Sequence, residues 1–252
     1  MSDRVLAALD GGVLTATLNR PEKKNAIDTA MIDALLTLLE RADLDSAVRV
    51  VAVRGAGADF CAGMDLNELL ASADKSVEQN RQAALHFAEI FVRMRHIPKP
   101  IVAVVHGRAF AGGCGLATAC DLVLATESAK LGYPEVQRGF VPAIVMTLLK
   151  RTTGEKVAFD LAATGRILGA PEAAGLGLVS RVYEDSDFED QVAEVLRALA
   201  AASPSALAFT KQQFYELDGL RFEDGIRLGA DVNAVSRTTP DFRAALQAFL
   251  KK

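Results

Sequence analysis

Along the first three quarters of the chain, segments with the hydrophobic spacing of strands alternate with segments that have the spacing of helices. Residues 12–20 alternate apolar and polar positions, as in a strand with one buried face. Residues 101–107, "IVAVVHG", are almost continuously apolar, which is typical of a strand covered on both faces. Strands are expected at 12–20, 48–55, 101–107, 121–126 and 178–183. The run at 48–55 ends at a glycine.

Segments with apolar residues every three or four positions separate these strands and indicate amphipathic helices. The helix within 25–45 has Asp28 as its expected N-cap, and Thr239-Pro240-Asp241 supplies a cap, an N1 proline and a first-turn acid to the last one. Further helices are expected at 77–95, 142–151, 154–163, 187–201, 204–217, 222–236 and 240–251. This alternation predicts an α/β fold with a core over 1–195 and a strand-free helical region over 196–252.

Composition narrows the class of protein. The 252 residues carry a formal net charge of only −4 without a basic block, which argues against a nucleic-acid partner. No run approaches the ~18 uncharged apolar residues of a membrane span, and the charged start "MSDRVLAALDGG" does not fit a secretory signal. The three cysteines have no metal-type spacing and are expected as free thiols. A cytoplasmic protein without membrane association is therefore expected.

Two predicted strands end in glycine-rich turns. "VVAVRGAGADFCAGMDL" contains Gly55, Gly57 and Gly63, and "IVAVVHGRAFAGGCGLATACD" leads through Gly112 and Gly113 into a short helix. Each glycine costs roughly 1 kcal/mol of helix propensity, but a backbone without Cβ lets a ligand approach, and first-turn amides are unsatisfied donors. Two such turns side by side would aim two N–H groups at one oxygen, as in an oxyanion hole. Tight turns and close helix packing explain the same glycines, and the pattern alone leaves both interpretations open.

Other glycine- and histidine-based sites fit the sequence poorly. "GAGADF" has Phe60 where a dinucleotide fingerprint needs its third glycine, and neither a P-loop nor a G-x-S-x-G motif occurs. His86, His96 and His106 lack metal-ligand spacing, so no metal site is expected.

Five segments together resemble the crotonase superfamily, in its enoyl-CoA hydratase/isomerase branch. They are "LNRPEKKNAID", "GADFCAGMDLNEL", "AFAGGCGLATACDLVLATESAKLGYPEVQRGFVP", "TGRILGAPEAAGLGLVSRV" and "DFRAALQAFLKK". The resemblance runs nearly end to end in consistent order. It implies a spiral of ββα units with a helical C-terminal trimerisation region, an acyl-CoA substrate, no separate cofactor, and a homotrimer or dimer of trimers.

The resemblance also assigns roles to particular positions. The amides of Met64 and Gly112 would bind the thioester oxygen, and Glu135 would act as the acid/base. Positions that would line coenzyme A are Lys24, Ala26, Ala62, Asp65, Leu66 and Asn67. The family often has lysine where Asn67 stands. The terminal Lys251 and Lys252 are either solvated or within reach of a coenzyme A phosphate.

One acid of the family's hydratases is missing here. These enzymes commonly hold water between two glutamates, one three residues past the oxyanion glycine, where this chain has Gly115. The absent side chain is expected to enlarge the substrate pocket for a branched or bulky acyl group. Another family variant uses an aspartate eight residues past the glutamate, where this chain has Ala143, also assigned to the pocket.

The resemblance favours hydration of the 2,3 double bond of an enoyl-CoA, with branched or 3-methylglutaconyl-like substrates included, whereas the missing acid favours isomerisation. The alternatives are isomerisation of a 3-enoyl-CoA to a 2-enoyl-CoA, which needs only one base, and acyl-CoA binding without catalysis.

Overall fold

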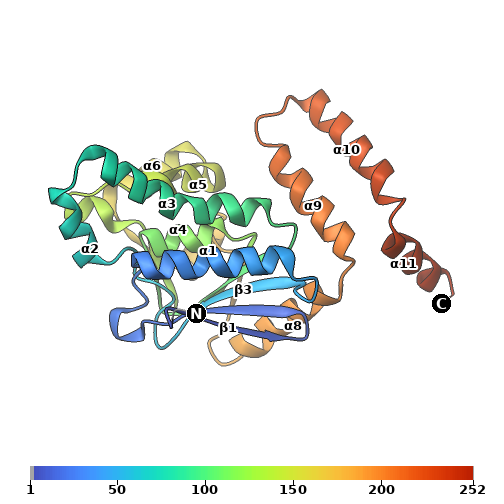
Figure 1. Ribbon diagram of the computed structural model, residues 1–252, viewed down its shortest axis with the longest axis horizontal. Helices are drawn as coiled ribbons and strands as arrows, with labels where there is room; N and C mark the ends of the chain where they lie inside the picture. Colours follow the sequence, from blue (N-terminus) through green and yellow to red (C-terminus); the bar gives the residue numbers. More distant parts are fainter. Residues whose placement is uncertain (1–2, 252) are drawn as a thin grey trace.

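The computed structural model describes residues 3–251, and its centre is a six-stranded sheet in the order β1-β2-β3-β4-β6-β9 (Figure 1). β1 and β2 form an antiparallel hairpin in which Val5 pairs with Leu18, and the strands from β2 onward are parallel. The strands are β1 (Val5–Asp10), β2 (Val13–Leu18), β3 (Val50–Gly55), β4 (Ile101–Val105), β6 (Leu122–Thr126) and β9 (Arg181–Tyr183). The five strands expected from the sequence are present, and β1 is an additional one.

Alternate residues of the central strands enter two separate cores, which explains their continuous apolar runs. In β3, Val51 and Val53 face the main core under helices α1 (Thr29–Leu44) and α3 (Val77–His96). Val50 and Ala52 face the opposite side, where helix α8 (Phe188–Ala201) packs. The expected α/β class is confirmed.

A second sheet of three-residue strands ties the loops together beyond the central sheet. Its order is β5-β7-β8, with β5 (Arg108–Phe110) parallel to β7 (Lys130–Gly132) and β7 antiparallel to β8 (Ile167–Gly169). Helix α4 (Gly112–Ala119) starts directly after β5, and the 3₁₀ helix η3 (Pro134–Arg138) starts just after β7. The pairing of β5 with β7 therefore places the starts of α4 and η3 close together.

The remaining helices complete the layers and an arm. The short ones are η1 (Pro21–Lys23), α2 (Leu66–Ala71), η2 (Ser72–Asp74) and α7 (Ala170–Gly175). The longer ones are α5 (Ala143–Thr153), α6 (Glu155–Thr164), α9 (Pro204–Glu216), α10 (Phe222–Ser236) and α11 (Pro240–Leu250). Asp28 and Thr239 cap α1 and α11, and both caps confirm the expectation from sequence.

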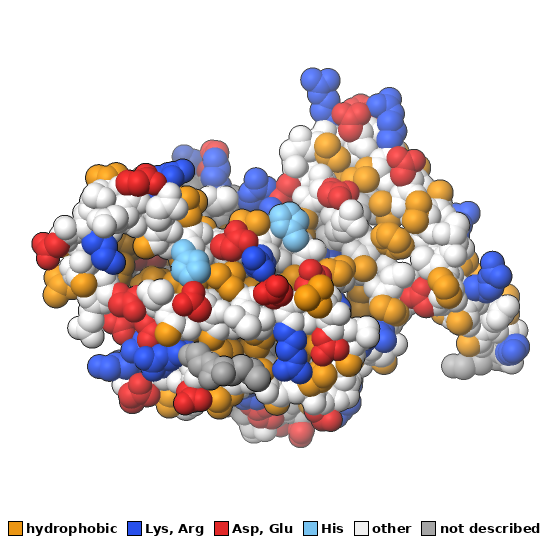
Figure 2. Space-filling model, in the orientation of Figure 1, with side chains coloured by type: hydrophobic (Ala, Val, Ile, Leu, Met, Phe, Trp, Pro, Cys, Tyr) orange, Lys and Arg blue, Asp and Glu red, His pale blue; other side chains and the backbone are white. Residues whose placement is uncertain are grey.

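Helices α9, α10 and α11 form an arm that projects from the layered body (Figure 1). No described residue of α10 or α11 is buried, and apolar side chains are exposed along the arm (Figure 2). The large exposed ones are Phe214, Leu217, Leu220, Phe222, Ile226, Val235, Phe242, Leu246, Phe249 and Leu250. Because α8 packs fully on the sheet, the arm begins at Ser203, a few residues beyond the boundary suggested by the sequence.

A buried ion pair anchors α9 to the body. Lys211 Nζ lies 2.8 Å from Asp121 Oδ2 and donates to Lys99 O at 2.9 Å. Tyr215 donates to the other Asp121 oxygen at 2.7 Å, and Asp121 also accepts from the amide of Ile101, the first residue of β4. Burial lowers the pKa of Lys211, with the Asp121 carboxylate opposing that shift. The base of the arm is thus fixed to the beginnings of β4 and β6.

Within residues 3–251, no single helix is long and apolar enough to cross a membrane. The pair α8 and α9 passes on length and composition only when joined across a bend of 101°.

Candidate functional site

Met64 and Gly112 lie next to each other although 48 positions separate them in the sequence. A Cβ atom at position 63 would lie 3.3 Å from the Gly112 amide nitrogen, and one at position 112 would lie 3.6 Å from Met64 Cγ. The first would also lie 2.9 Å from Ala111 Cβ, and Gly63 has a left-handed φ of +98°. Only glycine combines this backbone angle with this close approach. The two glycine turns therefore meet in the structure.

The N–H groups of Met64 and Gly112 are not used by the hydrogen bonds of the local secondary structure. Met64 forms a parallel bridge with Ile27, but its bonds run from Ile27 N to Gly63 O and from Asp65 N to Ile27 O, both 2.8 Å. Gly112 is the first residue of α4, so its N–H has no hydrogen-bond acceptor within that helix. Two main-chain donors on adjacent turns are thus without an acceptor within residues 3–251, and that of Gly112 lies at the positive end of a helix.

Ala111, between β5 and α4, has a strained backbone. Its φ of 52° and ψ of −126° are unusual for a residue with a Cβ. Its amide donates to Gly132 O at 2.8 Å, so the pairing of β5 with β7 holds it in place. Strain of this kind costs about 1–3 kcal/mol and gathers at functional sites. It turns the chain so that α4 begins at Gly112.

Glu135 is buried at the start of η3, with only 7% of its surface exposed. Its Oε2 atom has no hydrogen-bond partner among the described residues. Burial raises the pKa of Glu135, while a backbone hydrogen bond and the charge of Arg138 act in the opposite direction. A carboxyl group with a raised pKa and an unused oxygen is suited to accepting and donating protons. Glu135 is not directed to bulk solvent.

A buried hydrogen-bonded chain that the sequence did not indicate lies beside Glu135. The Tyr133 hydroxyl lies 2.8 Å from Thr118 Oγ1, which donates to Cys114 O at 2.9 Å. Burial raises the pKa of the Cys114 thiol to about 11, and the charge of Glu135 adds to the increase. These groups remain neutral and link α4 to the β7–η3 turn. No sequence pattern marks Tyr133, two residues before Glu135, as part of such a hydrogen-bonded link.

The segments expected to line coenzyme A form one continuous surface region. Residues 24–27 run beside 62–65, joined by bonds such as Ala62 N to Lys24 O at 2.9 Å. Lys24, Leu66 and Asn67 are exposed, whereas Ala26 and Ala62 are half-buried. The structure therefore brings these six positions together.

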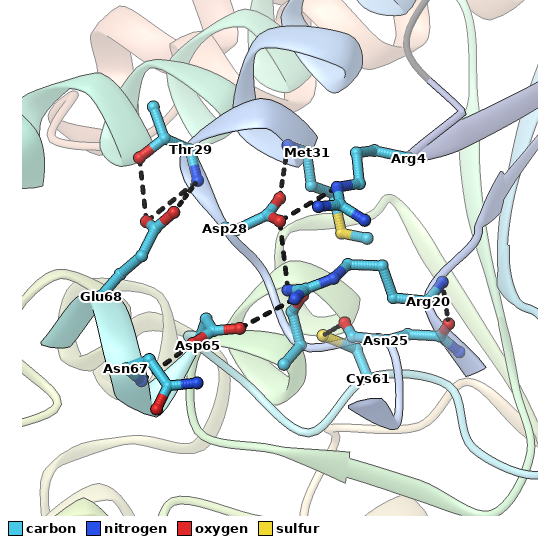
Figure 3. Close-up of polar contacts among 11 residues, drawn as sticks. Arg4, Arg20, Asn25, Asp28, Thr29, Met31, Cys61, Asp65, Asn67 and Glu68 are labelled. Atoms are coloured by element: carbon cyan, nitrogen blue, oxygen red, sulfur yellow. Dashed lines mark hydrogen bonds and ion pairs between the residues drawn. The ribbon is translucent and has the colours of Figure 1, made fainter. Parts of the chain in front are cut away.

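Arg20 lies between the two segments and contacts both (Figure 3). Its guanidinium lies 3.3 Å from Asp28 Oδ2 and 3.0 Å from Asp65 Oδ2, and it donates to Ala26 O at 2.7 Å. Burial alone would raise the pKa of Asp65, but hydrogen bonds from the Asn67 amide and Arg20 outweigh it and leave the pKa lowered. The Asp65 side chain is therefore occupied by Arg20 and by capping α2, and its contribution is to the shape of the surface. Arg20 was not among the residues singled out from the sequence, although it lies in "LNRPEKKNAID".

Position 115 differs from expectation. A Cβ atom at Gly115 would lie 2.1 Å from Val145 Cγ1, so the side chain of Val145 already occupies that space. The expectation that Gly115 enlarges the pocket is wrong for this reason. Ala143, the first residue of α5, is exposed two positions before Val145.

The remaining candidates have structural surroundings. His86 lies 2.7 Å from Asp33 on the surface, and His106 Nε2 lies 3.0 Å from Gly57 O. Cys61, Cys114 and Cys120 are free and buried. Lys251 is exposed beyond α11, and Lys252 lies outside the described residues.

Comparison with known proteins identifies relatives of this chain. The chain matches the family described as enoyl-CoA hydratase/isomerase over residues 9–252. A Thermus thermophilus protein provisionally named enoyl-CoA hydratase is 41% identical over 96% of both chains. An Escherichia coli 1,2-epoxyphenylacetyl-CoA isomerase is 30% identical, over 100% of this chain and 97% of its own.

Solved structures show the same fold. The crystal structure of an enoyl-CoA hydratase from Mycobacterium smegmatis superposes with a TM-score of 0.94 at 31% identity, over 99% of this chain and 97% of the other. With its match over residues 9–252 and its crotonase fold, the chain belongs to the enoyl-CoA hydratase/isomerase family of enzymes.

Proposed function

We propose that this enzyme hydrates the 2,3 double bond of an enoyl-CoA thioester. The observation that carries the proposal is the pair of unused amides at Met64 and Gly112, with the buried carboxyl of Glu135 on the turn tied to the same helix start. Family membership supports an acyl-CoA substrate, and the exposed surface of 24–27 and 62–67 is where we place the coenzyme A moiety.

In the proposed reaction Glu135 takes a proton from water while the water oxygen bonds to Cβ. The electrons of the double bond move toward the thioester, and the negative charge on its oxygen is stabilised by the Met64 and Gly112 N–H groups. Removing one such donor typically costs about 3–4 kcal/mol of transition-state stabilisation. Glu135 then gives the proton to Cα, so the net change is addition of one water molecule.

Isomerisation is the second candidate, and the space filled beside Gly115 favours it. Here Glu135 removes a proton from C2 of a 3-enoyl-CoA, the double bond shifts to C2–C3, and the same carboxyl returns the proton to C4. The reaction uses the same amides and needs no water, so a single carboxyl group suffices.

The test combines three substrates with two variants. Incubation of 2-enoyl-, 3-enoyl- and 3-methylglutaconyl-CoA in deuterated water, read by mass spectrometry, separates water addition from double-bond migration. We expect Glu135→Gln to lower turnover by about 10²–10⁴-fold with acyl-CoA binding retained. Glu127→Gln, at an exposed carboxyl on the turn after β6, is the control and should leave turnover unchanged. Saturable binding without turnover of any of the three substrates would refute the proposal.

The acyl group and the assembly are also proposed. Arg138 is exposed and close enough for its charge to act on the pKa of Glu135, so a substrate with a distal carboxylate, such as 3-methylglutaconyl-CoA, has a cation to pair with. The exposed apolar residues of α10 and α11 support assembly into a trimer or a dimer of trimers through the region 196–252. Three free, buried thiols support the cytoplasm as location.

A further inference from the structure

Gly115 and Val145 fit together across the contact between α4 and α5. Gly115 is three residues after Gly112 on α4, so both positions lie on the same side of that helix. A Cβ at 115 would lie 2.1 Å from Val145 Cγ1, 2.8 Å from Val145 Cβ and 3.8 Å from Val145 Cγ2. Both methyl groups and the Cβ of the valine therefore surround the place where a side chain of residue 115 would begin.

Val145 cannot move out of this place easily. Only 3% of it is exposed, and it is part of the main core together with Leu149, one turn later on α5. A β-branched side chain within a helix has essentially one favoured rotamer. An acidic side chain at 115 would collide with hydrocarbon, and its carboxylate would begin its path among apolar groups.

We infer that Val145 is a specificity-determining residue that fills the volume beside the α4 amide in which a second, water-holding carboxylate would lie. The inference rests on the proposed function. On this side the reacting carbons face hydrocarbon, and the acid/base chemistry is confined to Glu135. A water molecule is then oriented by one carboxyl group instead of two, and hydration competes with proton transfer from carbon to carbon. The pair Gly115 and Val145 thereby sets the ratio of hydrated to isomerised product.

The test is a cycle of Gly115→Glu, Val145→Gly and the double variant, compared with the natural enzyme. Val145→Ala is not sufficient, because the Val145 Cβ itself would remain 2.8 Å from a Cβ at 115. Gly115→Glu alone should melt well below the natural enzyme, and adding Val145→Gly should recover part of that loss. With a 3-enoyl-CoA in deuterated water, the double variant should raise the ratio of 3-hydroxyacyl-CoA to isomerised product at least about tenfold, and neither single variant should do so.

Val192→Gly is the matched control, because Val192 is also 3% exposed and lies in α8 on the opposite face of the sheet. It should lower the melting temperature without changing the product ratio. The inference is overturned if a folded double variant keeps the natural product ratio, if Gly115→Glu alone is as stable as the natural enzyme, or if Val192→Gly shifts the ratio equally. Failure of the proposed function is a different outcome: the natural enzyme then turns over neither a 2-enoyl- nor a 3-enoyl-CoA, and the inference falls with it.

Discussion

Replacing Gly63 with alanine tests the donor pair directly. The added methyl group would lie 2.9 Å from Ala111 Cβ, 3.0 Å from Phe110 O and 3.3 Å from the Gly112 amide nitrogen. It would therefore push apart the two turns that carry the Met64 and Gly112 amides. The first two contacts are with a short side chain and a main-chain oxygen, so relief requires movement of the backbone.

The expected loss of stability of Gly63→Ala has two parts. A left-handed backbone with a Cβ costs roughly 1–2 kcal/mol, and crowding in a packed region adds typically 1–3 kcal/mol. Together they predict a loss of about 2–5 kcal/mol in the free energy of unfolding. If the backbone shift removes one donor from the thioester oxygen, kcat should fall by about 10²–10³-fold.

Gly154→Ala separates these two parts. Gly154 has a φ of +78° but no atom within 4 Å of its would-be Cβ, so the substitution carries the backbone cost without the collision. Both variants are compared by denaturant unfolding and by steady-state kinetics at a temperature where circular dichroism shows them folded. We expect Gly154→Ala to lose stability and keep kcat. A folded Gly63→Ala enzyme with the kcat of Gly154→Ala would show that the Met64 and Gly112 amides do not act on the substrate.

Three further predictions concern charge and assembly. Burial raises the folded-state pKa of Glu135, so the folded protein binds that proton more tightly than the unfolded chain does. The stability that this proton contributes is lost as pH rises through the raised pKa. Glu135→Gln should therefore melt above the natural enzyme at pH 7, with the difference gone below a pH of about 4. The Asp65 pKa is lowered, so the stability that its carboxylate contributes is present above a pH of about 3.9 and is lost as pH falls further. Asp65→Asn should lower the free energy of unfolding by about 1–3 kcal/mol at pH 7 in urea titrations, because Arg20 loses a partner. Equal unfolding midpoints at pH 7 would contradict this. Phe249→Asp, at a side chain 74% exposed on α11, should shift the proposed oligomer toward smaller species in sedimentation velocity, whereas Phe159→Asp on α6, 75% exposed, should not.

The longer elements of this fold could be predicted from the sequence because each contains enough residues to show a repeating hydrophobic pattern. The α1 cap at Asp28 and the α11 start at Thr239 follow from local hydrogen-bonding chemistry, which needs only neighbouring residues. The strands β5, β7 and β8 have three residues each, too few to show any period, and form only because distant loops pair. The small sheet that places α4 beside η3 was therefore not predictable from spacing.

The site shows a similar division. The glycine turns at 63 and 112 fitted either free main-chain donors or tight turns, and the assignment of Met64, Gly112 and Glu135 followed from the family resemblance. The space at Gly115 was wrongly expected to be open, because Val145 lies 30 positions away and no local pattern relates the two. The Arg20 ion pairs were missed for the same reason: Asp65 joins them only after the segments have come together.

The Arg20 contacts have a thermodynamic consequence for whatever binds across 24–27 and 62–67. One guanidinium connects Asp28, the cap of α1, with Asp65, the cap of α2, so contacts within the chain itself fix both edges of that surface. A ligand there need not order a loop as it arrives, and the entropy normally lost in that ordering is saved. In the function proposed above, discrimination between acyl-CoA thioesters then falls to the acyl end, where we place the amides, Glu135 and Val145.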